Sequence, residues 1–99
     1  MPAALATATY ATSPPVFSTP INLSNDAGKA IDPNVQNVGT SVFVSWTEGS
    51  GGIKFRMSPD GGVTWNPPLT SPELKLSNKG GVAQYPLMSV NGSNVYVVW

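Results

Sequence analysis

Apolar residues gather in short runs along the chain, and glycine, proline and polar residues separate these runs. Runs of about four to eight residues that are rich in Val, Ile and aromatic side chains are typical of β-strands. Pro and Gly interrupt nearly every window that is long enough to hold a helix. The protein is therefore expected to be all-β, with strands over Val16–Leu23, Asn34–Val38, Val42–Trp46, Ile53–Met57, Leu69–Leu76, Leu87–Val90 and Val95–Trp99.

The sequence also predicts where some of these strands lie in a sheet and which segments form loops or turns. Val16–Leu23 contains a proline, which cannot donate to a strand ladder, so it is expected at a sheet edge. Val42–Trp46 and Val95–Trp99 are nearly continuous in Val and aromatic residues, and each is expected to be buried on both faces. Asn25–Asp32 and Gly49–Gly52 are predicted to be loops, and Asp60–Gly62 is predicted to be a turn.

Two parts of the chain repeat one another with an offset of 53 residues. Residues 13–46 and 66–99 are identical at 13 of 34 aligned positions, among them a Pro-Pro pair, a Leu-Ser-Asn triplet and a final Trp. A period of about 50 residues suits a four-stranded β-propeller blade. The sequence thus predicts a first propeller repeat over residues 13–65 and a partial second repeat over residues 66–99.

Composition excludes several classes of function. Five basic and five acidic residues cancel, and charged residues make up only 10% of the chain. Nucleic-acid binding needs clustered basic residues, and no apolar run approaches the ~20 residues of a membrane-spanning helix, so neither nucleic acid nor membrane insertion is expected. The chain has no Cys and no His. This removes disulfides and the commonest metal ligands, so we expect no metal site and no cofactor.

Residues 58–65 read SPDGGVTW. This segment resembles the Asp-box, S-x-D-x-G-x-T-W, of sialidase-like β-propellers with BNR repeats, and every consensus position matches: Ser58, Asp60, Gly62, Thr64 and Trp65. Together with the repeat length and the strand order, the resemblance covers about residues 13–99. It implies four-stranded antiparallel propeller blades, about 1.75–2 per chain. In the family the box closes the hairpin between the third and fourth strands, away from the ligand face, which implies a structural role here.

The residue types of the box also predict a pinned turn on physical grounds. The Asp60 carboxylate can accept hydrogen bonds from nearby backbone N–H groups. Gly62 can adopt φ values that other residues avoid, and the hydroxyls of Ser58 and Thr64 can bond across the turn. Trp65 can pack its ring into the blade and direct its N–H to an acceptor.

Catalysis is not expected. The resemblance implies that a sialidase would need three arginines and a Tyr–Glu pair, whereas Arg56 is the single arginine of this chain. Retaining glycosidases need two carboxylates about 5–5.5 Å apart, and the loop carboxylates of Asp26, Asp32 and Glu48 are interpreted as solvated charges. Without His there is no ordinary serine triad.

A ligand would bind where the loops between blades meet the loops between second and third strands. Tyr85 is the best candidate there for stacking on a sugar ring. The alternative interpretation is that the polar and aromatic residues of these loops are ordinary loop residues with no ligand. The candidate ligand-binding residues are Asp26, Asp32, Glu48, Gln84 and Tyr85.

The predicted strands are too few for a closed propeller, because stacked repeats usually need about three units. The second repeat would lack its third and fourth strands, the fourth coming from Val16–Leu23 of another copy. Residues 1–12 are either a leader or a makeshift strand through Leu5–Tyr10. Copies would join head to tail, and the oligomer would complete a ring where the rotation closes or a filament where it does not. Alternatively, the chain is a piece of a longer propeller.

Three functions are compatible with these patterns. The preferred one is a non-catalytic propeller repeat module that forms a homo-oligomer through its blade faces and strand edges. The alternative is a lectin-like carbohydrate-binding module with a glycan as its partner, and the third is a fragment of a sialidase-like glycosidase. The family resemblance and the low charge favour an extracellular or cell-surface location.

Overall fold

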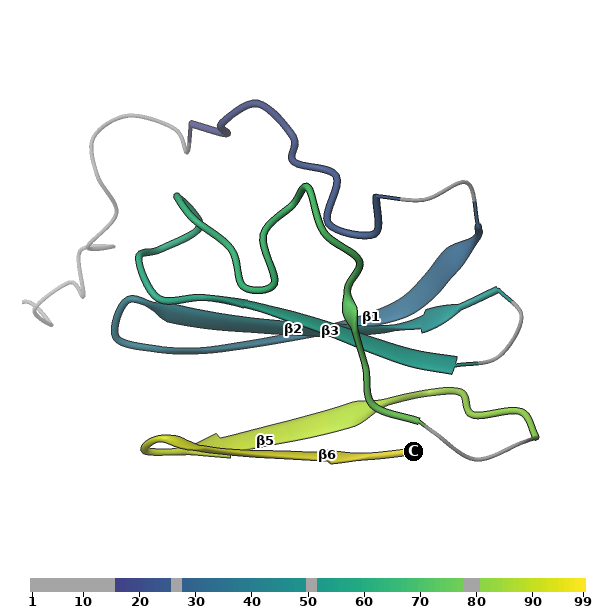
Figure 1. The fold of residues 1–99 in the computed structure, drawn as a ribbon. Helices are drawn as coiled ribbons and strands as arrows, with labels where there is room; N and C mark the ends of the chain where they lie inside the picture. The colour runs from purple at the N-terminus through teal and green to yellow at the C-terminus, as the bar shows by residue number, and fades with distance from the viewer. Residues whose placement is uncertain (1–15, 26–27, 50–51, 78–80) are drawn as a thin grey trace, which may run out of the picture.

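The computed structural model describes residues 16–25, 28–49, 52–77 and 81–99. Within these residues the protein has six strands and no helix, so the predicted all-β class is confirmed. The strands form a four-stranded sheet and a separate two-stranded hairpin, which lie in two layers (Figure 1). None of the described residues forms a helix that could cross a membrane.

The four-stranded sheet is an antiparallel meander in sequence order: β1 (Ala30–Val38), β2 (Ser41–Glu48), β3 (Gly52–Ser58) and β4 (Leu74–Lys75). β2 is the most buried of these strands, as its apolar pattern predicts. Directly opposed residues share a face. The first face carries Val35, Val44, Trp46, Lys54 and Arg56, and we call it the loop face because segments 21–24 and 67–73 cover part of it.

The opposite side of the sheet packs on the hairpin formed by β5 (Leu87–Asn91) and β6 (Asn94–Val98), and we call it the hairpin face. It carries Phe43 and Phe55, whose stacked rings have centroids 6.4 Å apart. The backbone N–H of Tyr85 donates to Thr47 Oγ1 across the two layers at 3.1 Å. The hairpin has an inner face (Met88, Val90, Val95 and Val97) and an outer face (Leu87, Ser89, Tyr96 and Val98). The prediction that Val95–Trp99 is buried on both faces is wrong, because Tyr96 and Val98 on the outer face are exposed.

Backbone conformation follows the sequence repeat. Asp32 and Tyr85, which are 53 residues apart, both have positive φ, 54° and 59°, and a proline follows each. The glycines of the two hairpin turns, Gly39 and Gly92, have φ of 57° and 60°. The offset read from the sequence therefore relates equivalent positions of the structure.

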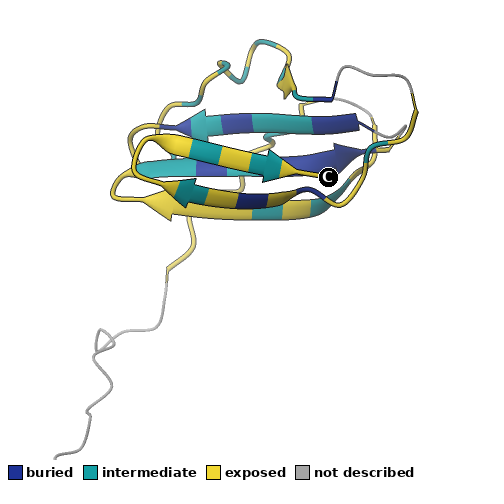
Figure 2. Ribbon diagram, turned by 90° about the horizontal axis from the view of Figure 1, so that it is seen from below, coloured by how far each residue is buried: buried dark blue, intermediate teal, exposed yellow. Residues whose placement is uncertain are grey.

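The core is small and partly polar. Among the described residues only four hydrophobic side chains are buried, namely Phe43, Trp46, Ile53 and Met88, whereas thirteen large ones are exposed. Figure 2 shows exposed residues along the hairpin and buried ones in the sheet behind it. A single copy therefore leaves much of its apolar surface in water.

Three predicted elements are wrong in extent. Val16–Leu23 is irregular rather than a strand, because it pairs with no sheet edge among the described residues; only its last part, at Ile21–Leu23, lies against the loop face. Leu69–Leu76 contributes only the two residues of β4, since its first part turns around Arg56. The loop predicted over Asn25–Asp32 ends early, because β1 begins at Ala30 and continues through a register irregularity between Ile31 and Asn34. Residues 1–12 lie outside the described residues.

Candidate functional site

The turn that follows β3 holds all five residues of the box. Ser58 Oγ donates to Asp60 Oδ1 at 2.9 Å and accepts the N–H of Gly62 at 2.8 Å. Asp60 Oδ1 accepts the backbone N–H of Thr64 at 2.8 Å, and Oδ2 accepts the Thr64 hydroxyl at 2.7 Å. The carboxylate thus bridges both ends of the turn in the way its position in the sequence predicts.

The tip of this turn is fixed from two sides. Trp65 Nε1 donates to the carbonyl of Gly62 at 3.1 Å, and Gly62 has a φ of 97° that L side chains rarely adopt. The N–H of Gly61 donates to Thr40 O at 2.7 Å, and Thr40 Oγ1 donates to Pro59 O at 2.9 Å. These bonds fasten the box to the turn between β1 and β2, at one rim of the sheet.

Hydrogen bonding lowers the pKa of Asp60 below its ordinary value of 3.8. The backbone N–H of Thr64 is the main cause, and the Thr64 hydroxyl adds to it. Both donors favour the charged carboxylate. The folded state therefore binds a proton here less readily than the unfolded chain does.

Stability is expected to depend on this carboxylate at low pH. Because the pKa of folded Asp60 lies below 3.8, its contribution is present above the unfolded pKa and is lost as the pH falls through the folded pKa. Thermal melts from about pH 6 to about pH 2 should show a decline that Asp60→Asn makes shallower. Asp60→Ala should lower the melting temperature by several degrees at neutral pH; an unchanged melting curve would contradict the turn-pinning role.

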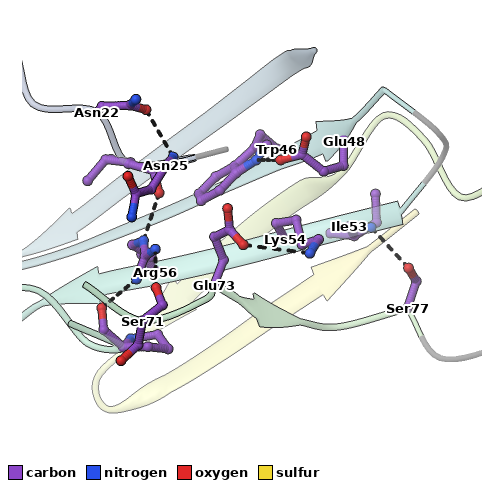
Figure 3. Close-up of polar contacts among 12 residues, drawn as sticks. Asn22, Asn25, Trp46, Glu48, Ile53, Lys54, Arg56, Ser71, Glu73 and Ser77 are labelled. Carbon is purple, nitrogen blue, oxygen red and sulfur yellow. Dashed lines mark hydrogen bonds and ion pairs between the residues drawn. The ribbon is translucent and has the colours of Figure 1, made fainter. Parts of the chain in front are cut away.

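Arg56 is a fully buried cation that stands on β3, on the loop face. Its guanidinium donates to four backbone carbonyls: Leu23 O at 2.7 Å, Pro67 O at 2.6 Å, Pro68 O at 2.9 Å and Ser71 O at 2.8 Å. Figure 3 shows the guanidinium and the Ser71 carbonyl that it contacts. The single salt bridge among the described residues joins Lys54 and Glu73, so Arg56 is satisfied by carbonyl dipoles alone.

This arginine joins three parts of the chain. Its donors reach the segment before β1 at Leu23 and the segment that returns from the box to β4 at Pro67, Pro68 and Ser71. Four of its five N–H groups are used, and the planar fork fixes their directions. From the sequence alone, Arg56 is only a single arginine where a sialidase site would need three. The signal that could have revealed its role is a lone charge inside an apolar strand, followed shortly by Pro67-Pro68.

Glu48 was predicted to lie in a loop, and this prediction is wrong. It is the last residue of β2 and is buried, and its Oε1 accepts Trp46 Nε1–H at 2.9 Å (Figure 3). Residues i and i+2 of a strand project from the same face, which brings the two side chains together. One oxygen of this candidate ligand carboxylate is therefore engaged inside the protein.

The other described candidates gather at the end of the sheet opposite the box. Asp32 lies near the start of β1, and Gln84 and Tyr85 come just before β5. Because Tyr85 N–H bonds to Thr47, which pairs with Ile31, the structure brings Tyr85 to the end of β1 that carries Asp32. The side chain of Tyr85 is exposed. Asp26 lies outside the described residues.

Metal binding finds no support among the described residues, where no group of three or more Asp, Glu, His or Cys could hold an ion. Comparisons with family models, with curated proteins and with solved structures found no significant match. The fold defines the class of this protein: an all-β chain in which an antiparallel sheet packs face to face on a hairpin.

Proposed function

We propose that the chain is a non-catalytic β-propeller repeat module whose role is to assemble, head to tail, with copies of itself into a complete propeller or a filament. The observation that carries the proposal is the packing of hairpin β5–β6 on the sheet. The hairpin repeats the sequence of β1–β2, so one chain already stacks one repeat on the next. An extracellular location belongs to the same proposal.

The sheet has the strand arrangement expected of one blade. β1 to β4 form a four-stranded antiparallel meander, and the box joins the third strand to the fourth, where the resemblance expects it. Ser77 Oγ accepts the N–H of Ile53 at 3.0 Å, which extends the contact between β3 and the segment after β4. These features support a blade as the structural unit.

Exposed apolar surface supports assembly. Stacked repeats are stable when neighbours bury the faces that one unit cannot cover alone. The described part of the chain exposes thirteen large hydrophobic side chains and buries four. Such surface on a soluble chain commonly marks an interaction site.

The chemistry of Arg56 supports a non-catalytic role. A sialidase-like site would need arginines whose donors face a substrate carboxylate. Arg56 is fully buried, and its donors are bonded to carbonyls of Leu23, Pro67, Pro68 and Ser71. We therefore do not propose glycoside hydrolysis.

The native mass tests this function. Light scattering coupled to size-exclusion chromatography, from about 1 µM to about 500 µM chain, is expected to show a folded species whose mass is a multiple of 10.3 kDa. Mass action predicts dissociation toward the lowest concentrations. A folded 10.3 kDa particle over the whole range would overturn the proposal.

A further inference from the structure

The contact between the sheet and the hairpin has equivalents elsewhere on the same chain. In the 53-residue repeat, the residues of the inner face of the hairpin are equivalent to residues of the loop face of the sheet: Met88 corresponds to Val35, and Val97 corresponds to Val44. In the same way, the residues of the hairpin face of the sheet are equivalent to residues of the outer face of the hairpin, with Phe43 corresponding to Tyr96. Each half of the internal contact therefore has a second copy on the surface.

Residues that are buried in the internal contact, on the side of the hairpin, have equivalents in β1 that are exposed. Met88 is 4% exposed because the sheet covers it, whereas the equivalent Val35 is 62% exposed. In the same way Pro86 is buried and the equivalent Pro33 is exposed. The loop face thus presents the same kind of surface that the hairpin buries.

The second half of the contact shows the same difference. Phe43 is 8% exposed beneath the hairpin, whereas the equivalent Tyr96 on the outer face of the hairpin is 58% exposed. Ser45 is fully buried, and the equivalent Val98 is exposed. The outer face of the hairpin thus presents the surface that the sheet offers internally.

A groove on the loop face repeats the cleft between the two layers. The cleft is lined by Phe55 and Leu74 of the sheet, by Leu76 just after β4, and by Val95 and Val97 of the hairpin. The lining of the groove includes Ile21, Leu23 and Val44, which are the equivalents of Leu74, Leu76 and Val97. The segment before β1 therefore contacts the loop face of the sheet in a position equivalent to that of the segment around β4 beside the hairpin.

We infer that the outer face of the hairpin of one copy docks on the loop face of a second copy, where it covers Val35 and the adjoining groove and repeats the internal contact of the chain. The inference rests on the proposed self-assembly and specifies its surfaces and its direction. Two different surfaces meet, so the contact is heterologous and repeats from copy to copy.

Charge does not oppose this contact. Residues 85–99 contain no charged side chain. On the loop face, Lys54 is paired with Glu73 at 3.6 Å, and Arg56 is fully buried. The exposed side chains that would meet are mainly apolar, with Leu87, Tyr96 and Val98 on the hairpin and Val35 on the sheet. Their burial would supply the driving force for association.

Two charge substitutions test the direction of the contact. Val35→Glu should block the loop face, and Tyr96→Glu should block the outer face of the hairpin, each weakening self-association by more than about tenfold. Val63→Glu is the matched control, because Val63 is exposed in the box turn and belongs to neither surface. Mixing the two blocked variants should give a 1:1 heterodimer and nothing larger, since one intact contact remains.

The outcomes separate this inference from the function on which it rests. A monomeric parent chain would overturn both. An oligomeric parent whose Val35→Glu variant associates as before, or a mixture of blocked variants that stays monomeric, would overturn the docking surfaces and leave self-assembly standing. Circular dichroism checks that each variant is folded; where a Glu variant is unfolded, Val35→Thr and Tyr96→Thr keep strand propensity and are compared by their association constants.

Discussion

Replacing Arg56 with methionine is expected to lower the free energy of unfolding by about 3–5 kcal/mol. The side chain is fully buried and donates to four carbonyls in two segments. Methionine fills much of the volume but leaves these carbonyls without donors, and each unsatisfied buried group is costly. Arg56→Lys should be intermediate, because an ammonium keeps the charge but cannot reproduce the planar fork.

Urea denaturation at one fixed protein concentration measures this effect and keeps any contribution from association constant. Lys29→Met is the matched control, since it removes a positive charge from an exposed side chain. We expect the control to change the free energy of unfolding by less than about 0.5 kcal/mol. Equal stability of the Arg56→Met and Lys29→Met variants would show that the hydrogen bonds from Arg56 to the four carbonyls do not stabilise the fold.

Replacing Trp46 with alanine is expected to cost about 3–5 kcal/mol. The ring is 3% exposed on the loop face, so its loss leaves a large cavity beside the groove. Trp46→Phe keeps part of the ring but removes the Nε1–H that bonds to Glu48. This variant should lose about 1–3 kcal/mol, because the buried acceptor loses its donor.

A double substitution separates packing from hydrogen bonding. In Trp46→Phe with Glu48→Met, both polar partners are gone, and such paired replacement is often close to neutral. The double variant should therefore be more stable than Trp46→Phe alone in urea denaturation. A strictly additive loss in the double variant would mean that the Trp46–Glu48 bond contributes nothing to stability.

Local patterns predicted much of this fold. The strands predicted over residues 42–46, 53–57 and 87–90 lie within β2, β3 and β5, and the one over 95–99 matches β6 except at Trp99. Alternation and β-branched content act over a few neighbouring residues, so they can be read from the sequence. The turn of the box was predictable for the same reason: the hydrogen bonds within the box join residues no more than four apart. The repeat was visible because it is a property of the sequence.

Long-range contacts were not predictable in this way. Arg56 bonds to a carbonyl 33 residues earlier in the chain and to others 11–15 residues later. Glu48 appeared to lie in a loop, since nothing nearby in sequence shows that β2 extends to it. The irregular course of Val16–Leu23 depends on which strand it could pair with, and a ladder partner is a tertiary property.

The sequence by itself determined the all-β class, the 53-residue repeat and the pinned turn at Asp60, because each depends on residue type and on neighbours a few positions away. Only the tertiary structure decided which faces are covered. Equivalent residues such as Met88 and Val35 have similar chemistry, yet one is buried and the other exposed. Burial depends on what packs against a residue in space, and that is fixed by the stacking of the sheet and the hairpin.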